Sequence, residues 1–463
     1  MNAPTPPVVI VSNRGPVSFA LDDGGGLVTR RAGGGLATAL GAAVAGTGAT
    51  WIAAALSEAD RVAAAEGTVD AEGFRLRSLV VDEDRYRAYY DVVSNATLWF
   101  LHHGLWDSPR RPRFDRRWRE AWTAYREVNH AFADAVADEA ADGATVLVHD
   151  YHLSLVGARL AERRPDLATV HFNHTPFCGA DAIRALPDGV AEELLLGLAG
   201  HAACGFHNQR WASAFEACCE EVLGSVPTRT FVAPAAADPD DIGGVAGGDA
   251  CARALAELDE QVGDRALIVR VDRIELSKNL LRGFHAFDDL LREHPEWRER
   301  VVFAAFVYPS REGLPEYLAY RQEVEGLIRA INERWSTPGW IPVLYDPEDD
   351  FPRSVAALRR YDVLLVNPVR DGLNLVAKEG PLVNEHHGVL ALSRESGVWA
   401  EMAGAALGLN PFDVAGTSDV LHEALTMTAG QRRDHAAAVR AVAAAGTPAD
   451  WYARQLDEGA HGA

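Results

Sequence analysis

Hydrophobic positions along the chain alternate between two patterns. Short runs rich in β-branched residues, typical of buried parallel strands, are separated by stretches in which apolar residues recur at helical spacing. The runs predict strands at Val8–Ser12, Thr145–His149, Ala168–Asn173, Ala266–Val271, Val301–Val307, Asp362–Asn367 and Gly388–Ser393. The spacing predicts helices over Arg116–Asp142, Leu281–Glu293, Leu314–Arg334 and Pro352–Arg360. This alternation indicates an α/β fold with parallel sheets.

A segment rich in alanine, proline, glycine and aspartate, Val232–Gly248, separates two such α/β stretches. A strand-first pattern restarts after it, and 463 residues exceed what one ordinary core accommodates. We therefore predict two doubly wound, Rossmann-like domains, residues 1–234 and 235–448, with residues 449–463 packing back on the first. In such folds ligands bind at the carboxyl ends of parallel strands, so we expect a cleft with functional residues there.

The chain is strongly acidic, with 66 Asp and Glu against 44 Lys and Arg and a formal charge of −22. Such a surface repels nucleic acid and anionic membranes at long range, so we expect neither as a partner. No apolar run is long enough to cross a bilayer, and the first residues carry no signal-peptide pattern, which favours the cytoplasm. The sequence is compatible with a homo-oligomer.

The five cysteines are odd in number and form no Cys-x-x-Cys pair. This argues against a disulfide framework and against a zinc knuckle, and predicts buried free thiols. Among the histidines, His149, His152 and His174 follow predicted strands, but no second group has metal-ligand spacing. We therefore expect no catalytic metal and no cofactor.

Two cations, Arg273 and Lys278, follow the strand predicted at Ala266–Val271. An arginine that binds oxygens bidentately and a lysine that adds a mobile charge suit a diphosphate. A pair of solvated surface cations is the alternative.

An Asp-Gly turn, Asp371-Gly372, follows the strand predicted at Asp362–Asn367 and is followed by a helix-like stretch. The amino end of a helix directs free N–H groups outward and can hold phosphate. Glu379 lies eight residues after Asp371, a suitable position for ribose hydroxyls. A helix start without a ligand is the alternative.

Two glycine clusters, Gly24–Gly26 and Gly33–Gly35, follow the first predicted strand and precede a helix expected from Leu36. Consecutive glycines let a backbone approach a phosphate closely. They do not match the dinucleotide pattern Gly-x-Gly-x-x-Gly, and a surface loop is the alternative.

Taken together, these segments resemble the trehalose-6-phosphate synthase family of retaining glycosyltransferases, which have the two-domain GT-B architecture. Eight motifs occur in the family's order: SNR (Ser12–Arg14), GGL (Gly34–Leu36), YYDVVSNATLW (Tyr89–Trp99), HDYHL (His149–Leu153), HTPF (His174–Phe177), RIELSK (Arg273–Lys278), SR (Ser310–Arg311) and RDGLNLVAKE (Arg370–Glu379). The resemblance implies transfer of glucose from a nucleotide-activated donor to glucose 6-phosphate, giving α,α-trehalose 6-phosphate.

The resemblance also implies a role for particular residues. The phosphate of glucose 6-phosphate is expected at Arg14 and Arg311, with Tyr90 assisting. Three side chains are expected to shape the acceptor pocket: Trp51, Trp99 and Asp150. The donor diphosphate is expected at Gly34, Gly35, Arg273 and Lys278 and at the N–H groups of Asn374 and Leu375. The donor sugar is expected at His174 and Asp371, and the ribose at Glu379.

In this family the cations stabilise the leaving diphosphate, and that phosphate takes the proton of the acceptor hydroxyl. No protein nucleophile is then required; Asp371 is the one carboxylate that could act as one, and we expect that it does not. The acidic stretch Leu344–Phe351 falls where the family places part of the nucleoside pocket. Carboxylates suit the paired N–H donors of guanine, and Pro381–Glu385 resembles the branch that uses GDP-linked donors. GDP-glucose is therefore favoured over UDP-glucose.

Two alternatives stay open. The same branch contains pseudo-glycosyltransferases, which couple a nucleotide-activated cyclitol to an amino-cyclitol phosphate; Tyr90 and the complete NLVAKE run disfavour this. An inactive sugar-phosphate-binding protein is a second alternative, and the presence of both donor cations and both acceptor arginines disfavours it.

Overall fold

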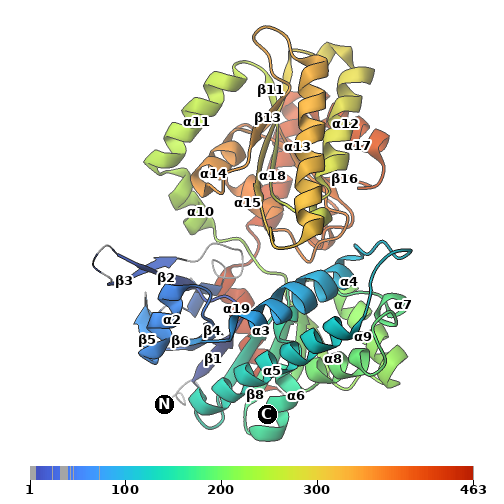
Figure 1. Ribbon diagram of the computed structural model, residues 1–463. Coiled ribbons are helices and arrows are strands. Elements are labelled where there is room, and N and C mark those ends of the chain that lie inside the picture. Colours follow the sequence, from blue (N-terminus) through green and yellow to red (C-terminus); the bar gives the residue numbers. More distant parts are fainter. Residues whose placement is uncertain are drawn as a thin grey trace. The chain divides into compact units, whose positions relative to one another are not determined.

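The computed structural model describes residues 7–461 except 23, 25, 32–39, 42, 45 and 72. The chain divides into two compact units (Figure 1). The first comprises Met1–Ala235 together with Pro448–Ala463, and the second comprises Ala236–Thr447.

The first unit contains a sheet of eight strands in the order β10-β9-β8-β7-β1-β4-β6-β5. All neighbours are parallel except β5 and β6. A separate antiparallel hairpin joins β2 and β3. The strands are β1 (Val8–Val11), β2 (Val17–Leu21), β3 (Leu27–Arg31), β4 (Thr50–Ala54), β5 (Thr68–Ala71), β6 (Phe74–Leu79), β7 (Thr145–His149), β8 (Ala168–Asn173), β9 (Ala203–Phe206) and β10 (Arg229–Val232).

Helices cover this sheet, and the longest of them begins where Asp115 accepts the backbone N–H of Trp118. The helices are α2 (Glu58–Ala65), α3 (Glu83–Arg87), α4 (Phe100–His103), α5 (Arg116–Glu139), α6 (Val156–Arg163), α7 (Ala180–Ile183), α8 (Val190–Ala199), α9 (Gln209–Leu223) and α19 (Pro448–Ala460), with the π-helix η1 (Ala88–Trp99) and the 3₁₀ turn η2 (Tyr151–Leu153). The last helix, α19, packs on β7 and β8.

The second unit contains a fully parallel sheet of six strands in the order β13-β12-β11-β14-β15-β16. The strands are β11 (Ala266–Ile274), β12 (Val301–Pro309), β13 (Val343–Asp346), β14 (Val363–Val366), β15 (Val389–Ser393) and β16 (Leu407–Leu409). Strands β11, β12, β14 and β15 are almost entirely buried, as parallel strands covered on both faces must be.

The covering helices are α10 (Pro239–Ala246), α11 (Asp249–Val262), α12 (Leu280–Glu293), α13 (Pro315–Trp335), α14 (Phe351–Arg360), α15 (Val376–Val383), α16 (Trp399–Met402), α17 (Val414–Thr426) and α18 (Ala429–Ala443). Two 3₁₀ turns complete the unit: η3 (Leu276–Lys278) and η4 (Pro295–Trp297). Helix α12 follows β11 and brings the chain back to the start of β12, as in a parallel crossover.

The structure confirms an α/β fold built on parallel sheets. The five cysteines are buried and free, as expected. For the first glycine cluster the structure agrees with the surface-loop interpretation and not with a phosphate loop ahead of a helix. Gly24 and Gly26 lie in the turn of the β2–β3 hairpin, where both backbone N–H groups donate to Asp22. Among the described residues, no helix has the length and apolar composition needed to cross a bilayer.

Candidate active site

The donor residues predicted in the second unit converge at the carboxyl ends of β11 and β14. These strands pair in parallel, so the segments that follow them meet at one edge of the sheet. Lys278, in η3 after β11, lies 2.6 Å from Asp371, which follows β14 (Nζ to Oδ2). Asp272 lies 3.7 Å from the same Nζ. Lys278 and Asp272 therefore form one cluster with Asp371, which lies 93 residues from Lys278 in sequence.

Charge is maintained in this cluster although it is largely buried. Burial alone lowers the pKa of Lys278, but the nearby carboxylates of Asp371 and Asp272 more than offset this, and the pKa lies above its ordinary value. The pKa of Asp272 is raised, mainly by burial. Lys278 is therefore a protonated, positioned cation at neutral pH.

Glu275 is a residue of the candidate site that the sequence analysis did not single out. Its side chain is fully buried, and Oε2 accepts a hydrogen bond from Arg311 at 2.8 Å and forms an ion pair with Arg273 at 3.2 Å. Ser277 donates to the other oxygen at 3.0 Å. The period of a strand puts positions 273 and 275 on one face, and this was the available signal. Glu275 holds the two arginines side by side.

The two arginines differ in exposure. The Arg273 side chain is 37% exposed, whereas that of Arg311 is 9% exposed. Arg311 also donates to the hydroxyl of Tyr317 at 3.2 Å, and its guanidinium lies over the Tyr317 ring. Arg311, expected at the acceptor phosphate, thus lies in the same unit as the expected donor residues.

The start of α15 is organised by Asn374. Its amide donates to Asp371 at 3.1 Å, and its side-chain oxygen accepts from the N–H of Ala377 at 3.2 Å. Helix α15 begins after Leu375 rather than directly after the Asp-Gly turn, which is later than the sequence suggested. Burial and nearby Asp241 raise the pKa of Glu379, in the first turn of α15, to about 7.

Three predicted site residues adopt positive φ angles that side chains rarely take: Asp150 (73°), Arg311 (48°) and Asn374 (87°). Such conformations cost on the order of 1–3 kcal/mol and cluster at functional sites. The backbone at these positions is therefore under constraint from its surroundings.

Most of the acidic side chains between β13 and α14 have structural partners. Asp346 pairs with Arg353 at 2.7 Å, and Asp350 caps α14 by accepting the N–H of Arg353 at 3.0 Å. Glu348 lies 3.4 Å from Arg353. Asp349 is exposed, and within the described part of the chain it has no hydrogen bond or ion pair. Of this stretch, Asp349 is the carboxylate left for a ligand.

In the first unit, Arg14 lies just beyond β1 and is exposed. Trp51, in β4, is fully buried, and its indole N–H donates to Ser12 at 2.8 Å. Ser12 in turn donates to the carbonyl of Arg14 at 2.5 Å. Trp51 therefore supports the segment that carries Arg14 from within the core.

The π-helix η1 carries the two other aromatic residues of the predicted acceptor pocket. Tyr90 is half-buried and stacks between Tyr86 (5.5 Å) and His152 (5.6 Å, both ring centroids). Trp99 is buried and stacks on His103 at 3.8 Å. π-Helices are rare and occur frequently at functional sites.

Asp150 and His174 lie at the carboxyl ends of adjacent strands, β7 and β8. Asp150 lies 3.8 Å from His152, and its backbone N–H donates to Phe172 at 2.8 Å. His174 lies 3.1 Å from His149 (Nε2 to Nδ1) and contacts the ring of Trp451 of α19. Burial lowers the pKa of His174 to about 3, so the ring is neutral and suited to hydrogen bonds with hydroxyls.

The remaining predicted site residues, Gly34 and Gly35, lie outside the described residues.

Two solved structures share this fold. One, from E. coli, is described as bound with UDP-2-fluoro glucose; the identity is 27%, the TM-score 0.84, and the match covers 97% of this chain and 98% of that one. The other is an alpha,alpha-trehalose-phosphate synthase (UDP-forming) from Burkholderia xenovorans in complex with glucose-6-phosphate, at 25% identity and TM-score 0.83, covering 97% and 100%. The fold is that of the GT-B glycosyltransferases.

The chain belongs to glycosyltransferase family 20, whose family model matches residues 6–460. The bifunctional trehalose-6-phosphate synthase/phosphatase of Thermoproteus tenax is 34% identical over 372 residues, which are 77% of this chain and 49% of the relative. The trehalose-6-phosphate synthase of Mycolicibacterium vanbaalenii is 32% identical over 458 residues, covering 93% and 91%. The chain thus spans about half of the first relative and nearly all of the second.

Proposed function

We propose that the protein transfers glucose, with retention, from a nucleoside-diphosphate glucose to glucose 6-phosphate and so forms α,α-trehalose 6-phosphate. The observation that carries this proposal is the cluster at the ends of β11 and β14. There Arg273 and Lys278 are held as charged groups by buried carboxylates. Family membership and the names of the relatives support it.

In this proposal the second unit binds the donor. Arg273 and Lys278 neutralise the diphosphate, and the start of α15 adds the N–H groups of Asn374 and Leu375. Glu379 binds the ribose. In the first unit, His174 binds hydroxyls of the donor glucose.

The phosphate of the acceptor is assigned to Arg14 and Arg311 with Tyr90 assisting, and its sugar to Trp99 and Asp150. Trp51 acts indirectly, because it is fully buried and bonded to Ser12. The bond from the anomeric carbon to the diphosphate breaks as the acceptor oxygen bonds to that carbon on the same face. The acceptor proton passes to the leaving phosphate, whose charge the two cations stabilise. Asp371 already accepts from Lys278 and Asn374, which favours a positioning role over a nucleophilic one.

The test is a turnover assay with glucose 6-phosphate and either GDP-glucose or UDP-glucose, with the product identified by NMR. An α,α-1,1-linked disaccharide phosphate is expected. No product from either donor would favour the cyclitol-coupling alternative, which a cyclitol donor then tests. Binding of glucose 6-phosphate without turnover of any donor would indicate the inactive binding protein. The cytoplasmic location stays a prediction of the sequence.

Arg311→Ala is expected to raise KM for glucose 6-phosphate about 10–100-fold with little change in kcat, because a charge-assisted phosphate contact distant from the reacting bond is lost. Glu275 keeps Arg273 as a partner, so the fold should survive. Steady-state kinetics with the acceptor varied measure the effect. Arg321→Ala is the matched control, since Arg321 pairs with Glu312 and Glu325 nearby. An unchanged KM would contradict the assignment.

The preference for GDP-glucose rests on the resemblance of Pro381–Glu385 to the GDP-using branch and on the acidic stretch Leu344–Phe351, in which Asp349 is the carboxylate left for a ligand. Guanine offers two adjacent N–H donors to a carboxylate, so Asp349→Asn is expected to lower kcat/KM for GDP-glucose about tenfold and to leave UDP-glucose unaffected. Glu348→Gln, one residue away, is the control. Equal losses with both donors, or wild-type turnover far higher with UDP-glucose, would reject the preference. The Burkholderia xenovorans enzyme is described as UDP-forming, which supports the outcome of higher turnover with UDP-glucose.

A further inference from the structure

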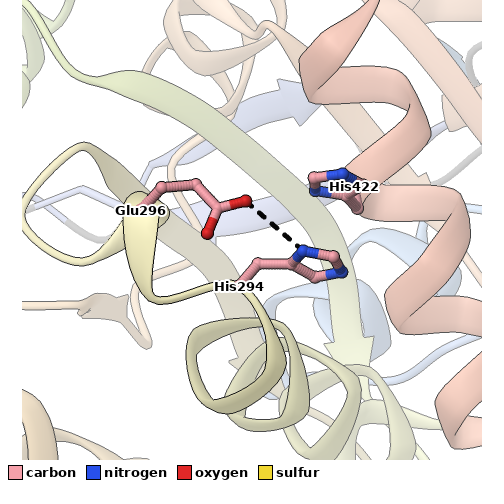
Figure 2. Close-up of side chains that lie close together, drawn as sticks. All are labelled: His294, Glu296 and His422. Carbon is pink, nitrogen blue, oxygen red and sulfur yellow. Dashed lines mark ion pairs between the residues drawn. The ribbon is translucent and has the colours of Figure 1, made fainter.

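Three side chains with metal-binding atoms converge in the second unit (Figure 2). His294 follows the end of α12, Glu296 lies in η4, and His422 lies in α17. One ligand atom of each lies within 4.8 Å of those of the other two. Helix α12 begins beside Lys278 and has 14 residues, so its far end lies about 20 Å away along its axis.

The spacing of the first two ligands already suits an ion. Nδ1 of His294 lies 3.4 Å from Oε1 of Glu296, as the dashed line in Figure 2 marks. Ligand atoms at zinc bond lengths in a tetrahedral arrangement lie about 3.4 Å apart. Both residues therefore need little movement to bind one ion.

The third ligand, His422, stacks on His294. The ring centroids lie 3.6 Å apart and the planes differ by 8°. An imidazole binds a metal ion through an unprotonated ring nitrogen.

Trp297 identifies the nitrogen of His422 that carries a lone pair. Its indole N–H donates to Nδ1 of His422 at 3.0 Å. Indole is only a donor, so this Nδ1 is unprotonated. An ion at Nδ1 would take the place of the indole N–H, and Trp297 would respond to binding.

We propose that His294, Glu296 and His422 bind a divalent transition-metal ion, with Zn²⁺ the first to test. Two imidazoles and a carboxylate are zinc ligands, and water completes such a site. The two rings must tilt out of the parallel stack to reach one ion, and both are partly exposed. The ion would tie η4 to α17 and so act on stability rather than on the reaction. The sequence analysis found no group with metal-ligand spacing, because His422 is distant in sequence from His294 and Glu296.

The test is calorimetric titration of the full chain with ZnCl₂ at pH 7.5 in a non-chelating buffer. One ion per chain is expected, with affinity lowered at least tenfold in His294→Gln and in His422→Gln. His387→Gln is the matched control, because His386 and His387 form an exposed histidine pair elsewhere. Equal affinity in wild type and in the doubly substituted His294→Gln, His422→Gln chain, or no binding at all, would overturn the proposal.

A second variant separates loss of ligands from loss of folding. Trp297→Phe removes a donor that competes with the ion, so zinc affinity should be equal or higher than in wild type. The zinc-induced change in tryptophan fluorescence should disappear in this variant. A weaker affinity, or a fluorescence change that persists, would contradict the site. Neither readout depends on turnover, so the outcome is independent of the proposed function.

Discussion

Arg273→Ala is expected to lower kcat for glucosyl transfer about 10²–10³-fold, the loss typical of one preorganised donor to a developing negative charge. Glu275 raises the pKa of Arg273 and fixes its guanidinium at 3.2 Å. The charge is therefore present before the diphosphate leaves. Steady-state turnover with saturating donor and acceptor measures the effect.

This variant is well suited to a kinetic test because the fold should tolerate it. Removing one partner of a buried carboxylate usually destabilises strongly, but Glu275 keeps Arg311 at 2.8 Å and Ser277 at 3.0 Å. Arg292→Ala, which removes an exposed partner of Asp288, is the matched control and should retain full turnover. Near-normal activity of Arg273→Ala would show that the diphosphate binds elsewhere.

Much of the fold could be predicted because several strands are buried on both faces. Continuous apolar runs predicted β7 and β8 with the same first and last residues as in the structure, Thr145–His149 and Ala168–Asn173. Other strands were not predicted. Among them, β16 has three residues, and β9 (Ala203–Phe206) has four and contains a glycine. A run of three or four residues has no clear period, and β6 (FRLRSL), although six residues long, carries two arginines in place of a continuous apolar run.

The sequence predicted the site residues that directly follow strands. It did not predict side-chain contacts that depend on how neighbouring strands are aligned in the sheet. Lys278 and Asp371 follow paired strands, so their meeting follows from topology. The sharing of Glu275 by Arg273 and Arg311 required the register of β11 beside β12. The burial of Trp51 likewise depends on both neighbours of β4, which no local pattern defines.

Stability of the first unit is expected to fall steeply between pH 6.5 and 5. Four histidines, three of them buried and His174 largely buried, have pKa values lowered by burial: to about 3 for His174 and His201, and well below the usual 6.5 for His149 and His171. Below pH 6.5 these rings bind protons in the unfolded chain but not in the folded one. Stability from them is complete above pH 6.5 and is lost as the pH falls, by about 1.4 kcal/mol per pH unit for each ring.

Glu379, in the second unit, opposes this trend, because its folded pKa of about 7 exceeds the usual 4.5 and its proton stabilises the fold at lower pH. When both units unfold, four protons taken up against one released leave a net slope of about 4 kcal/mol per pH unit near pH 5. This is comparable with the whole stability of an ordinary domain, about 5–15 kcal/mol, so unfolding near pH 5 is expected. Urea unfolding followed by tryptophan fluorescence at pH 7.5, 6.5, 5.5 and 5.0 measures the slope.

His171→Leu isolates the contribution of one ring. Within the described part of the chain, neither nitrogen of His171 has a hydrogen-bond partner, so leucine removes a titrating group without breaking a hydrogen bond. The variant should match wild type at pH 7.5 within about 1.5 kcal/mol, as similar-sized apolar replacements do. Its slope below pH 6.5 should be smaller by about 1.4 kcal/mol per pH unit. His130→Gln, at an exposed position on α5, should leave the slope unchanged.

A wild-type slope that corresponds to uptake of less than one proton on unfolding would contradict this account. It would mean that the buried rings are already protonated in the folded unit. His174 could then not be the neutral partner that is proposed to bind the donor sugar.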